Sequence, residues 1–223
     1  MLNKFRDVIK QKGVREYSKI KGRVGVLVPH GGRLDIGAEQ IGNYVEQNTP
    51  ASMYVMSSRQ GNVKKHRVAS TKISHTHSKP LNEVINHSKY NVSIHGHSKP
   101  GQEKTVYVGG ENSYLKKRIA ARLKQYLPNG YAIEHDVAKM PRNIRGTGSR
   151  NIVNRSKEGG VQVELPMELR QGVGKSHSSS KLTGLSKKVG EAISEVVNEE
   201  FKKRPELGYQ KGKEYKDDYA KAA

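Results

Sequence analysis

The chain has 223 residues, of which 41 are Lys or Arg and 21 are Asp or Glu, and its formal net charge is +20. Such an excess of positive charge indicates a polyanionic partner or environment. Cysteine is absent, which excludes disulfides, thiolate metal sites and cysteine nucleophiles, so any metal must be bound by His and carboxylates. The sequence has no long apolar run and no apolar stretch near its start, so we expect neither a membrane span nor a secretory signal.

The apolar fraction of 33% is enough for one compact domain. We expect this domain to occupy residues 1–201, although residues 1–22 show little periodicity. Residues 202–223 contain 7 basic and 4 acidic side chains and almost nothing to bury. The sequence therefore predicts a charged, flexible tail after the domain.

The first apolar segments predict a strand, a helix and a second strand. Residues 24–28 form an apolar run that breaks at Pro29-His-Gly-Gly, which is typical of a buried strand entering a turn. Apolar side chains then recur at helical spacing after Gly37, and a second apolar run follows at residues 52–56. Strand, helix, strand is the opening of a parallel α/β unit.

The same alternation continues along the rest of the chain. Short helices or strands are expected wherever apolar residues cluster between Gly, Pro and Asn residues. The predicted elements are a helix after Pro80, strands at 90–94 and 105–108, a helix at 114–127, strands at 131–133 and 161–165, and an amphipathic helix at 185–197. This pattern predicts the α/β class.

A long stretch without periodicity, residues 136–155, separates the last two predicted strands. Loops of this length inside a compact domain are usually functional or disordered. The stretch contains Arg142, Arg145, Arg150 and Arg155, whose guanidinium groups match carboxylates and phosphates in geometry. A basic surface loop is the alternative for any one of these arginines.

Three side chains with catalytic or metal-binding chemistry lie at or near the ends of predicted strands: His30, His95 and Glu164. If the strands are parallel neighbours, these residues converge at one edge of the sheet. Asp35 follows His30 across a turn with two glycines, which lets both side chains reach one point. Two imidazoles and one carboxylate make a three-ligand zinc site with an open fourth position.

Each of these residues also has a structural interpretation. His30 can be a hydrogen-bonded turn residue, Asp35 can cap the following helix, and Glu164 can pair with a nearby arginine. The second imidazole can equally come from His75, His77 or His97. Motifs of serine hydrolases, nucleotidases and dehydrogenases are missing from the sequence, which argues against those classes.

Five segments, taken together and in order, resemble the poly-γ-glutamate hydrolase family of bacteriophages and bacilli. They are Val-Leu-Val-Pro-His-Gly-Gly-Arg-Leu-Asp at 26–35, Val-Ser-Ile-His-Gly at 92–96, Val-Tyr-Val-Gly-Gly at 106–110, Asn-Ile-Val-Asn-Arg at 151–155, and Gly-Val-Gln-Val-Glu-Leu at 160–165. The resemblance covers roughly residues 24–170. It implies an open mixed, mostly parallel sheet with helices on both faces and a core similar to that of metallocarboxypeptidases.

The resemblance also implies roles for individual residues. His30, Asp35 and His95 would bind one zinc ion, and Glu164 would be the catalytic carboxylate. Arg155, beside Asn154, would hold a substrate carboxylate. One departure concerns Asp35, since the family usually has Glu there, and the shorter side chain is expected to shift or weaken zinc binding unless the loop adapts.

The function implied by the resemblance is zinc-dependent hydrolysis of the γ-amide bonds of poly-γ-glutamate, by a phage protein that removes the host capsule. We expect a monomer that is made in the host cytoplasm and released on lysis, that has no membrane partner, and that binds nucleic acid only nonspecifically. Three alternatives stay open: another zinc amidase or peptidase acting on cell-wall peptides, a non-enzymatic binder of polyanions or nucleic acid, and a family member that lost zinc through Asp35.

Overall fold

The computed structural model describes residues 4–171, 182 and 184–208. The helices are α1 (Phe5–Val8), α2 (Ala38–Gln47), α3 (Val63–His66), α4 (Lys79–His87), α5 (Ser113–Tyr126) and α6 (Gly184–Lys203). The strands are β1 (Val14–Lys19), β2 (Gly22–Gly32), β3 (Ala51–Ser58), β4 (Tyr90–Gly96), β5 (Thr105–Gly109), β6 (Ala132–Glu134) and β7 (Gly160–Leu165). No helix in these described ranges is both long enough and apolar enough to span a membrane.

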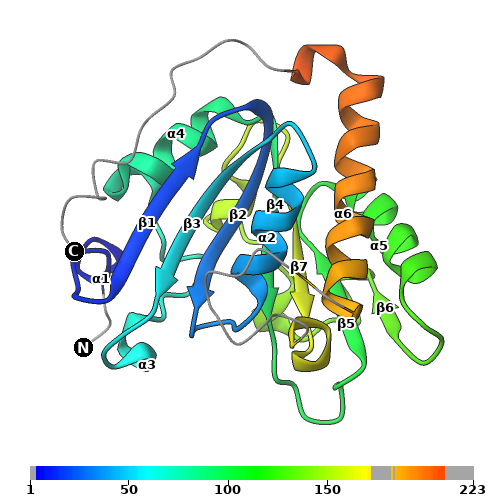
Figure 1. Ribbon diagram of the computed structural model, residues 1–223, viewed down its shortest axis with the longest axis horizontal. Coiled ribbons are helices and arrows are strands. Elements are labelled where there is room, and N and C mark those ends of the chain that lie inside the picture. The colour runs from blue at the N-terminus through cyan, green and yellow to red at the C-terminus, as the bar shows by residue number, and fades with distance from the viewer. Residues whose placement is uncertain (1–3, 172–181, 183, 209–223) are drawn as a thin grey trace.

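The strands form one seven-stranded sheet in the order β1-β3-β2-β4-β7-β5-β6. The four central strands β3, β2, β4 and β7 are parallel to one another, whereas β1 and β5 pair antiparallel with β3 and β7. Helices α2, α5 and α6 cover one face, and α4 covers the other (Figure 1). The predicted α/β fold with an open mixed, mostly parallel sheet and helices on both faces is confirmed.

The core follows from the alternation of side chains along the central strands. On one face, alternate residues of β2, β3, β4 and β7 pack with α2, α5 and α6 in a single apolar cluster. On the other face, Leu27, Tyr54 and Met56 pack against α1 and α4. Because successive strand residues point to opposite faces, the polar residues of β4 and β7 all lie on the side away from α2, α5 and α6.

Strand β2 continues through Pro29–Gly32, where the sequence predicts a turn. Its pairing with β3 shifts register between Val28 and Gly31, where Pro29 has no N–H to give to a ladder. Gly32 has φ of 65°, and a Cβ there would lie 2.4 Å from the Ser58 carbonyl oxygen. Glycine is therefore required at this position, and the irregular strand end carries His30 to the edge of the sheet.

Strand β1 is formed by residues for which the sequence predicts no regular element. It lies at the edge of the sheet, and its residues are half-buried or exposed, so apolar alternation is absent. Polar contacts fix it instead: the Tyr17 hydroxyl lies 3.3 Å from Glu39 Oε1, and Glu16 accepts hydrogen bonds from Tyr54 and Ser78. Pairing with β3 and these contacts outweigh the weak strand pattern.

The packed domain extends past residue 201, where the sequence places its end. Helix α6 runs to Lys203, and Leu207 is fully buried. Arg204 donates one hydrogen bond to each carboxylate oxygen of Glu158, at 2.7 and 2.8 Å, and lies over the ring of Tyr90. The first residues of the predicted tail thus pack against the domain, while residues 209–223 and the Gly/Ser-rich segment 172–181 lie outside the described residues.

We expect Arg204→Ala to lower the free energy of unfolding by about 1 kcal/mol or less at neutral pH, because it removes a partly exposed bidentate ion pair. Hydrogen bonds from Arg204 hold the pKa of Glu158 below its usual range. The stabilisation that this ion pair contributes is fully present above the pKa of Glu158 in the unfolded chain. It is lost as the pH falls through the lower pKa of Glu158 in the folded protein. Urea unfolding from neutral to acid pH should show the two proteins converge, with Lys203→Ala as a control; a constant difference would assign the effect to packing on Tyr90.

Candidate metal centre

The carboxyl ends of β2, β4 and β7 lie next to one another and bring three of the predicted residues together. In the register of β4 with β7, His95 lies directly opposite Glu164. His30 comes from the irregular end of β2, which pairs with β4 on its other side. Sheet topology therefore assembles these side chains from segments far apart in the sequence, at the edge where α/β proteins place their ligands.

Asp35 completes a buried cluster with the two imidazoles. The Nδ1 atoms of His30 and His95 lie 3.1 Å apart, and Asp35 Oδ2 lies 3.3 Å from the first and 3.7 Å from the second. The three residues are at most 5% exposed. The backbone N–H of Asp35 donates to the His30 carbonyl at 2.9 Å, so the turn after β2 closes and returns the carboxylate to the histidine.

The donor set fits a tetrahedral divalent cation. Zinc bound at about 2.0–2.1 Å from nitrogen and oxygen ligands holds neighbouring ligand atoms about 3.3 Å apart, close to the separations in this cluster. His30 Nε2 lies 2.8 Å from the carbonyl oxygen of Val68; a ring nitrogen facing a carbonyl carries the proton, which leaves Nδ1 free to coordinate. In the described part of the chain, this is the one group of at least three His, Cys, Asp or Glu side chains able to hold a metal.

Burial and hydrogen bonding favour the protonation states that ligands need. Burial alone would raise the pKa of Asp35, but hydrogen bonds and charge from His30 and His95 in their protonated forms, which prevail at acid pH, outweigh it and place this pKa well below its usual range. Burial lowers the pKa of His95 to about 4, against the opposing effect of Asp35. The carboxylate is therefore ionised and the His95 imidazole neutral at pH 7, as coordination requires.

Arg67 orients the carboxylate of this cluster and is absent from the residues that the sequence singles out. Its Nη2 donates to Asp35 Oδ1 at 2.7 Å, while the Gly96 N–H donates to Oδ2 at 3.1 Å. The guanidinium is partly exposed, with 45% of its side chain accessible. The signal that could have pointed to it is a stretch, residues 47–82, with six Lys or Arg and no Asp or Glu.

Glu164 lies beside the cluster with one side-chain hydrogen bond, from Gln162 Nε2 to its Oε1 at 2.9 Å. It is 5% exposed. Burial, followed by the negative charge of Asp35, raises the pKa of Glu164 well above its usual range. A cation held by the cluster would lower the pKa of Glu164. A carboxylate whose pKa is subject to these two opposing effects is suited to accept and donate protons.

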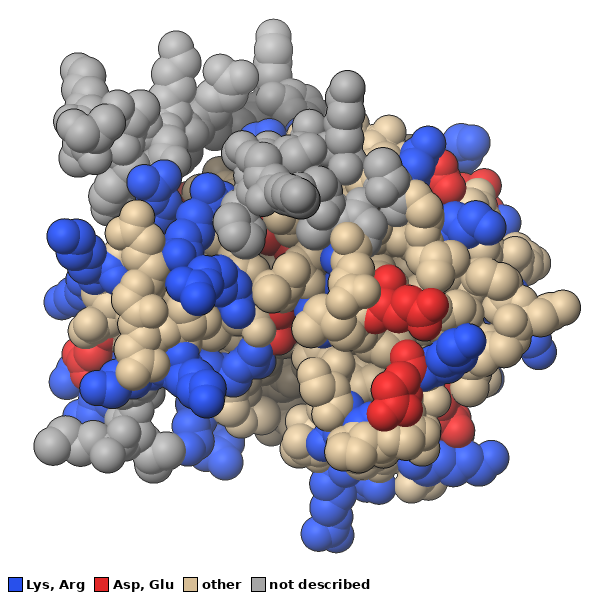
Figure 2. Space-filling model, turned by 60° about the horizontal axis from the view of Figure 1, so that its bottom comes forward, with Lys and Arg blue, Asp and Glu red and all other residues tan. Residues whose placement is uncertain are grey.

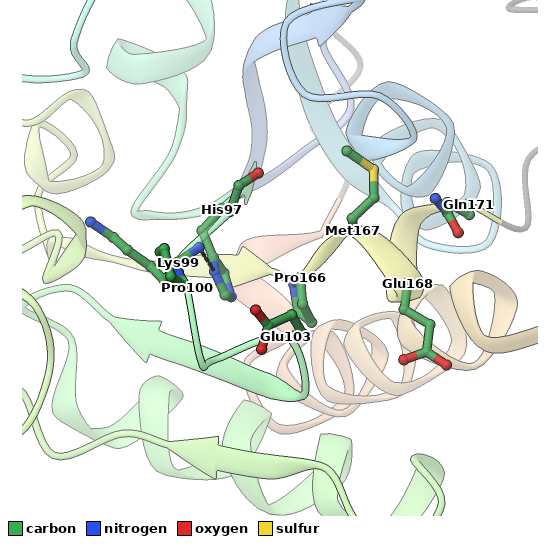
Figure 3. Close-up of a pocket in the computed structure, with 9 residues that line it drawn as sticks. His97, Lys99, Pro100, Glu103, Pro166, Met167, Glu168 and Gln171 are labelled. Carbon is green, nitrogen blue, oxygen red and sulfur yellow. Dashed lines mark hydrogen bonds between the residues drawn. The ribbon is translucent and has the colours of Figure 1, made fainter.

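The cluster opens into a cavity of about 450 Å³. Its floor carries His30, His95 and Glu164, and its walls come from segments 67–71, 95–99 and 143–151. A second cavity of about 460 Å³ adjoins it between segments 97–103 and 166–171 and shares three residues with it (Figure 3). The two cavities together offer an elongated site with the cluster to one side.

The other histidines in the described part of the chain lie outside the cluster. His97 lines both cavities, but its Nε2 faces the carbonyl oxygen of Thr105 at 2.8 Å. His75 and His77 lie on a short 3-10 helix before α4. The structure thus selects His95 among the candidates that the sequence leaves open for the second imidazole.

The edge of the sheet that carries the cluster is basic on one side of a central hollow, while Asp and Glu side chains are prominent on the other side (Figure 2). Viewed toward this edge, Lys and Arg gather on the side of the molecule that carries β1, α1 and α3, while carboxylates lie within the hollow (Figure 2). Two segments without any Asp or Glu, 47–82 and 137–157, contain six basic residues each. Both segments contribute residues to the wall of the cavity beside the cluster, whose lining includes Arg67 and Lys99.

A sequence model of the poly-gamma-glutamate hydrolase family matches residues 4–199. The chain belongs to this family. The protein YmaC of Bacillus subtilis (strain 168), known as a UPF0714 protein, is 28% identical over 159 residues, which cover 70% of this chain and 62% of YmaC. The chain thus spans less than two thirds of the length of that relative.

Two solved structures share the fold of this family member. A bacteriophage poly-gamma-glutamate hydrolase superposes with a TM-score of 0.72 at 24% identity, covering 86% of this chain and 91% of the other. A zinc-free structure of YndL superposes with a TM-score of 0.70 at 20% identity, covering 83% and 89% of the two chains.

Two residues that the resemblance linked to substrate lie outside both cavities of this hydrolase-family protein. Asn154 donates to the carbonyls of Gly146 and Gly148 at 2.7 and 3.2 Å, so its amide stabilises the loop. Arg155 is exposed, close enough to His75 to lower, after burial, the pKa of that histidine. Neither residue is among those that line the two cavities, and a contact of Arg155 with a substrate carboxylate stays a prediction.

Proposed function

We propose that the protein is a zinc-dependent hydrolase of the γ-amide bonds of poly-γ-glutamate. The observation that carries the proposal is the buried cluster of His30, Asp35 and His95 beside Glu164, at the floor of a cavity, in a chain of this family. Family membership names the substrate class, and the geometry supports a hydrolytic metal site.

His30 and His95 would bind zinc through Nδ1 and Asp35 through its carboxylate. When bound, zinc supplies activation of a water molecule and polarisation of the scissile carbonyl. Asp35 reaches both imidazoles in spite of its short side chain, because the turn after β2 closes tightly and Arg67 and Gly96 hold the carboxylate in place. This arrangement supports retention of zinc, against the alternative that Asp35 abolished binding.

Glu164 would move the protons of the reaction. It accepts a proton from the attacking water and donates it to the nitrogen of the leaving amine, as a general base and then a general acid. Its position on the strand next to His95 places it in the wall of the same cavity. Its burial raises the pKa, which favours the protonated carboxyl that the second transfer needs.

Positive charge around the cavity would attract and align the polymer. Each unit of poly-γ-glutamate carries one free carboxylate, because its amide uses the side-chain carboxyl. Arg67 and Lys99 line the cavity and are the groups best placed to contact carboxylates of units near the reacting amide, while Arg155 would contact only units farther along the chain. Charge at this density steers a polyanion to the site.

The test is product analysis with the zinc-loaded protein. We expect it to shorten poly-γ-glutamate and to release one amine per cut. We expect α-linked polyglutamate to stay intact, because a bound α-linked chain would place its amide away from the metal cluster. Added salt should raise KM through screening and leave kcat nearly unchanged. Size-exclusion chromatography measures the chain length of the polymer, and an amine assay counts the cuts. Both are carried out with and without a chelator.

Other outcomes separate the alternatives. Cleavage of cell-wall peptides in place of the polymer would identify another zinc amidase. Binding of nucleic acid that survives chelation, with no amidase activity, would identify a non-enzymatic polyanion binder. No cleavage of poly-γ-glutamate by zinc-loaded protein under any condition would reject the proposal. For a phage-encoded protein, the role that follows from the activity is removal of the host capsule.

A further inference from the structure

A chain of two side-chain amides leads from the long loop to Glu164. Asn151 Nδ2 donates to Gln162 Oε1 at 2.8 Å, and Gln162 Nε2 donates to Glu164 Oε1 at 2.9 Å. All three residues are at most 5% exposed, and all three line the cavity. Gln162 and Glu164 are two positions apart in β7, so they lie on the same face of the sheet.

The surroundings allow only one orientation of each amide. Gln162 Nε2 also lies 3.3 Å from the carbonyl oxygen of Ile144, which can only accept, so the nitrogen of this amide must face it and Glu164. Asn151 Oδ1 accepts from the backbone N–H of Val153 at 3.2 Å, so its nitrogen must face Gln162. Turning either amide over would place donor against donor or acceptor against acceptor.

We propose that Gln162 is a positioning residue for Glu164, and that Asn151 and the carbonyl of Ile144 hold Gln162 in place; this inference rests on the proposed function. The amide holds Glu164 Oε1 and leaves Oε2 to face the cavity. The long loop, which contributes both Asn151 and Ile144, therefore has a defined task. It fixes the direction of the Glu164 carboxylate on β7 through the side chain of Gln162.

Glu164 depends on this single contact for its orientation. Gln162 is its one side-chain hydrogen-bond partner among the described residues. A carboxylate without a fixed partner on one oxygen can rotate about its side-chain bonds, and a displacement of about 1 Å in a reacting group can lower a rate by about 100-fold. Substrate binding, in contrast, relies on the cavity walls and their charges, so loss of Gln162 should alter kcat more than KM.

The first experiment measures kinetics of Gln162→Leu, which removes the amide and keeps similar volume. We expect kcat on poly-γ-glutamate to fall about 10- to 100-fold, with KM within about twofold and zinc content unchanged. In a Glu164→Ala background, Gln162→Leu should cause no further loss, because it acts through the missing carboxylate. Asn151→Ala should give a smaller loss of the same kind, and Gln125→Leu, on the exposed side of α5, serves as the control.

A second readout does not depend on activity. A crystal structure of the metal-free wild type should show Glu164 in one rotamer. A crystal structure of metal-free Gln162→Leu should show Glu164 in several rotamers. Asn151→Ala supplies the same comparison if Gln162→Leu fails to fold. Additive losses in the double variant, loss of zinc, or an unchanged rotamer of Glu164 would each overturn the inference. Absence of polymer cleavage by the wild type would reject the proposed function alone, since the rotamer comparison still decides the positioning role.

Discussion

Glu164→Gln is expected to retain zinc and to lower turnover of poly-γ-glutamate by about 100-fold or more, the usual size of a general-base effect. The amide keeps the shape of the side chain but cannot accept the proton of the attacking water. The protein otherwise stays intact, because the amide can still accept a hydrogen bond from Gln162, whose Nε2 lies 2.9 Å from Glu164 Oε1. Initial rates, zinc content and thermal unfolding of the purified variant provide the measurement.

The matched control for this variant is Glu191→Gln, which makes the same chemical change in α6, outside both cavities. It should turn over polymer like the wild type. Near-normal turnover of Glu164→Gln would remove Glu164 from the reaction and leave it as a structural carboxylate. Zinc loss in Glu164→Gln would instead assign this residue to the metal site.

His95→Ala is expected to lose zinc and activity together, because two protein ligands hold the ion far more weakly than three. The change removes an imidazole whose Nδ1 lies 3.1 Å from that of His30 and 3.7 Å from Asp35 Oδ2. Metal analysis after dialysis against a weak chelator, beside polymer cleavage, measures both losses. We expect at most a trace of zinc and no measurable turnover.

His77→Ala is the control for His95→Ala, since His77 is exposed and lies outside the cluster and the two cavities. It should keep full zinc and full activity. Full zinc occupancy in His95→Ala would show that His95 is no ligand and would direct attention to His97, which lines the same cavity. Activity that persists after complete loss of zinc would contradict a metal-dependent reaction.

Sequence patterns predicted the central sheet and the convergence at its edge because both follow from local chemistry. Apolar runs indicate β2, β4 and β7, and parallel strands end at a common edge of the sheet. The sequence alone therefore predicts that His30, His95 and Glu164 lie together. Choice of His95 over His97 could not be made from spacing. It depends on strand register, which places His95 opposite Glu164 and leaves His97 facing Thr105.

Residues that act through tertiary contacts could not be found in this way. Gln162 is a neutral amide between two valines of β7, and the partners that hold it lie 11 and 18 residues away in an irregular loop. Arg67 is one arginine among many, and only the fold brings it to Asp35. Strand β1 lacks apolar alternation because it lies at the sheet edge, where polar contacts and pairing with β3 determine its structure.

The reacting groups and the walls of the cavity come from different parts of the architecture. His30, His95 and Glu164 lie on central strands of the sheet, whereas the walls are loops: 67–71, 97–103, 143–151 and 166–171. Loops accept insertions and substitutions that a parallel sheet does not. We therefore expect that substitutions in these loops can change which polymer such a protein recognises and leave the proposed metal centre on the strands intact.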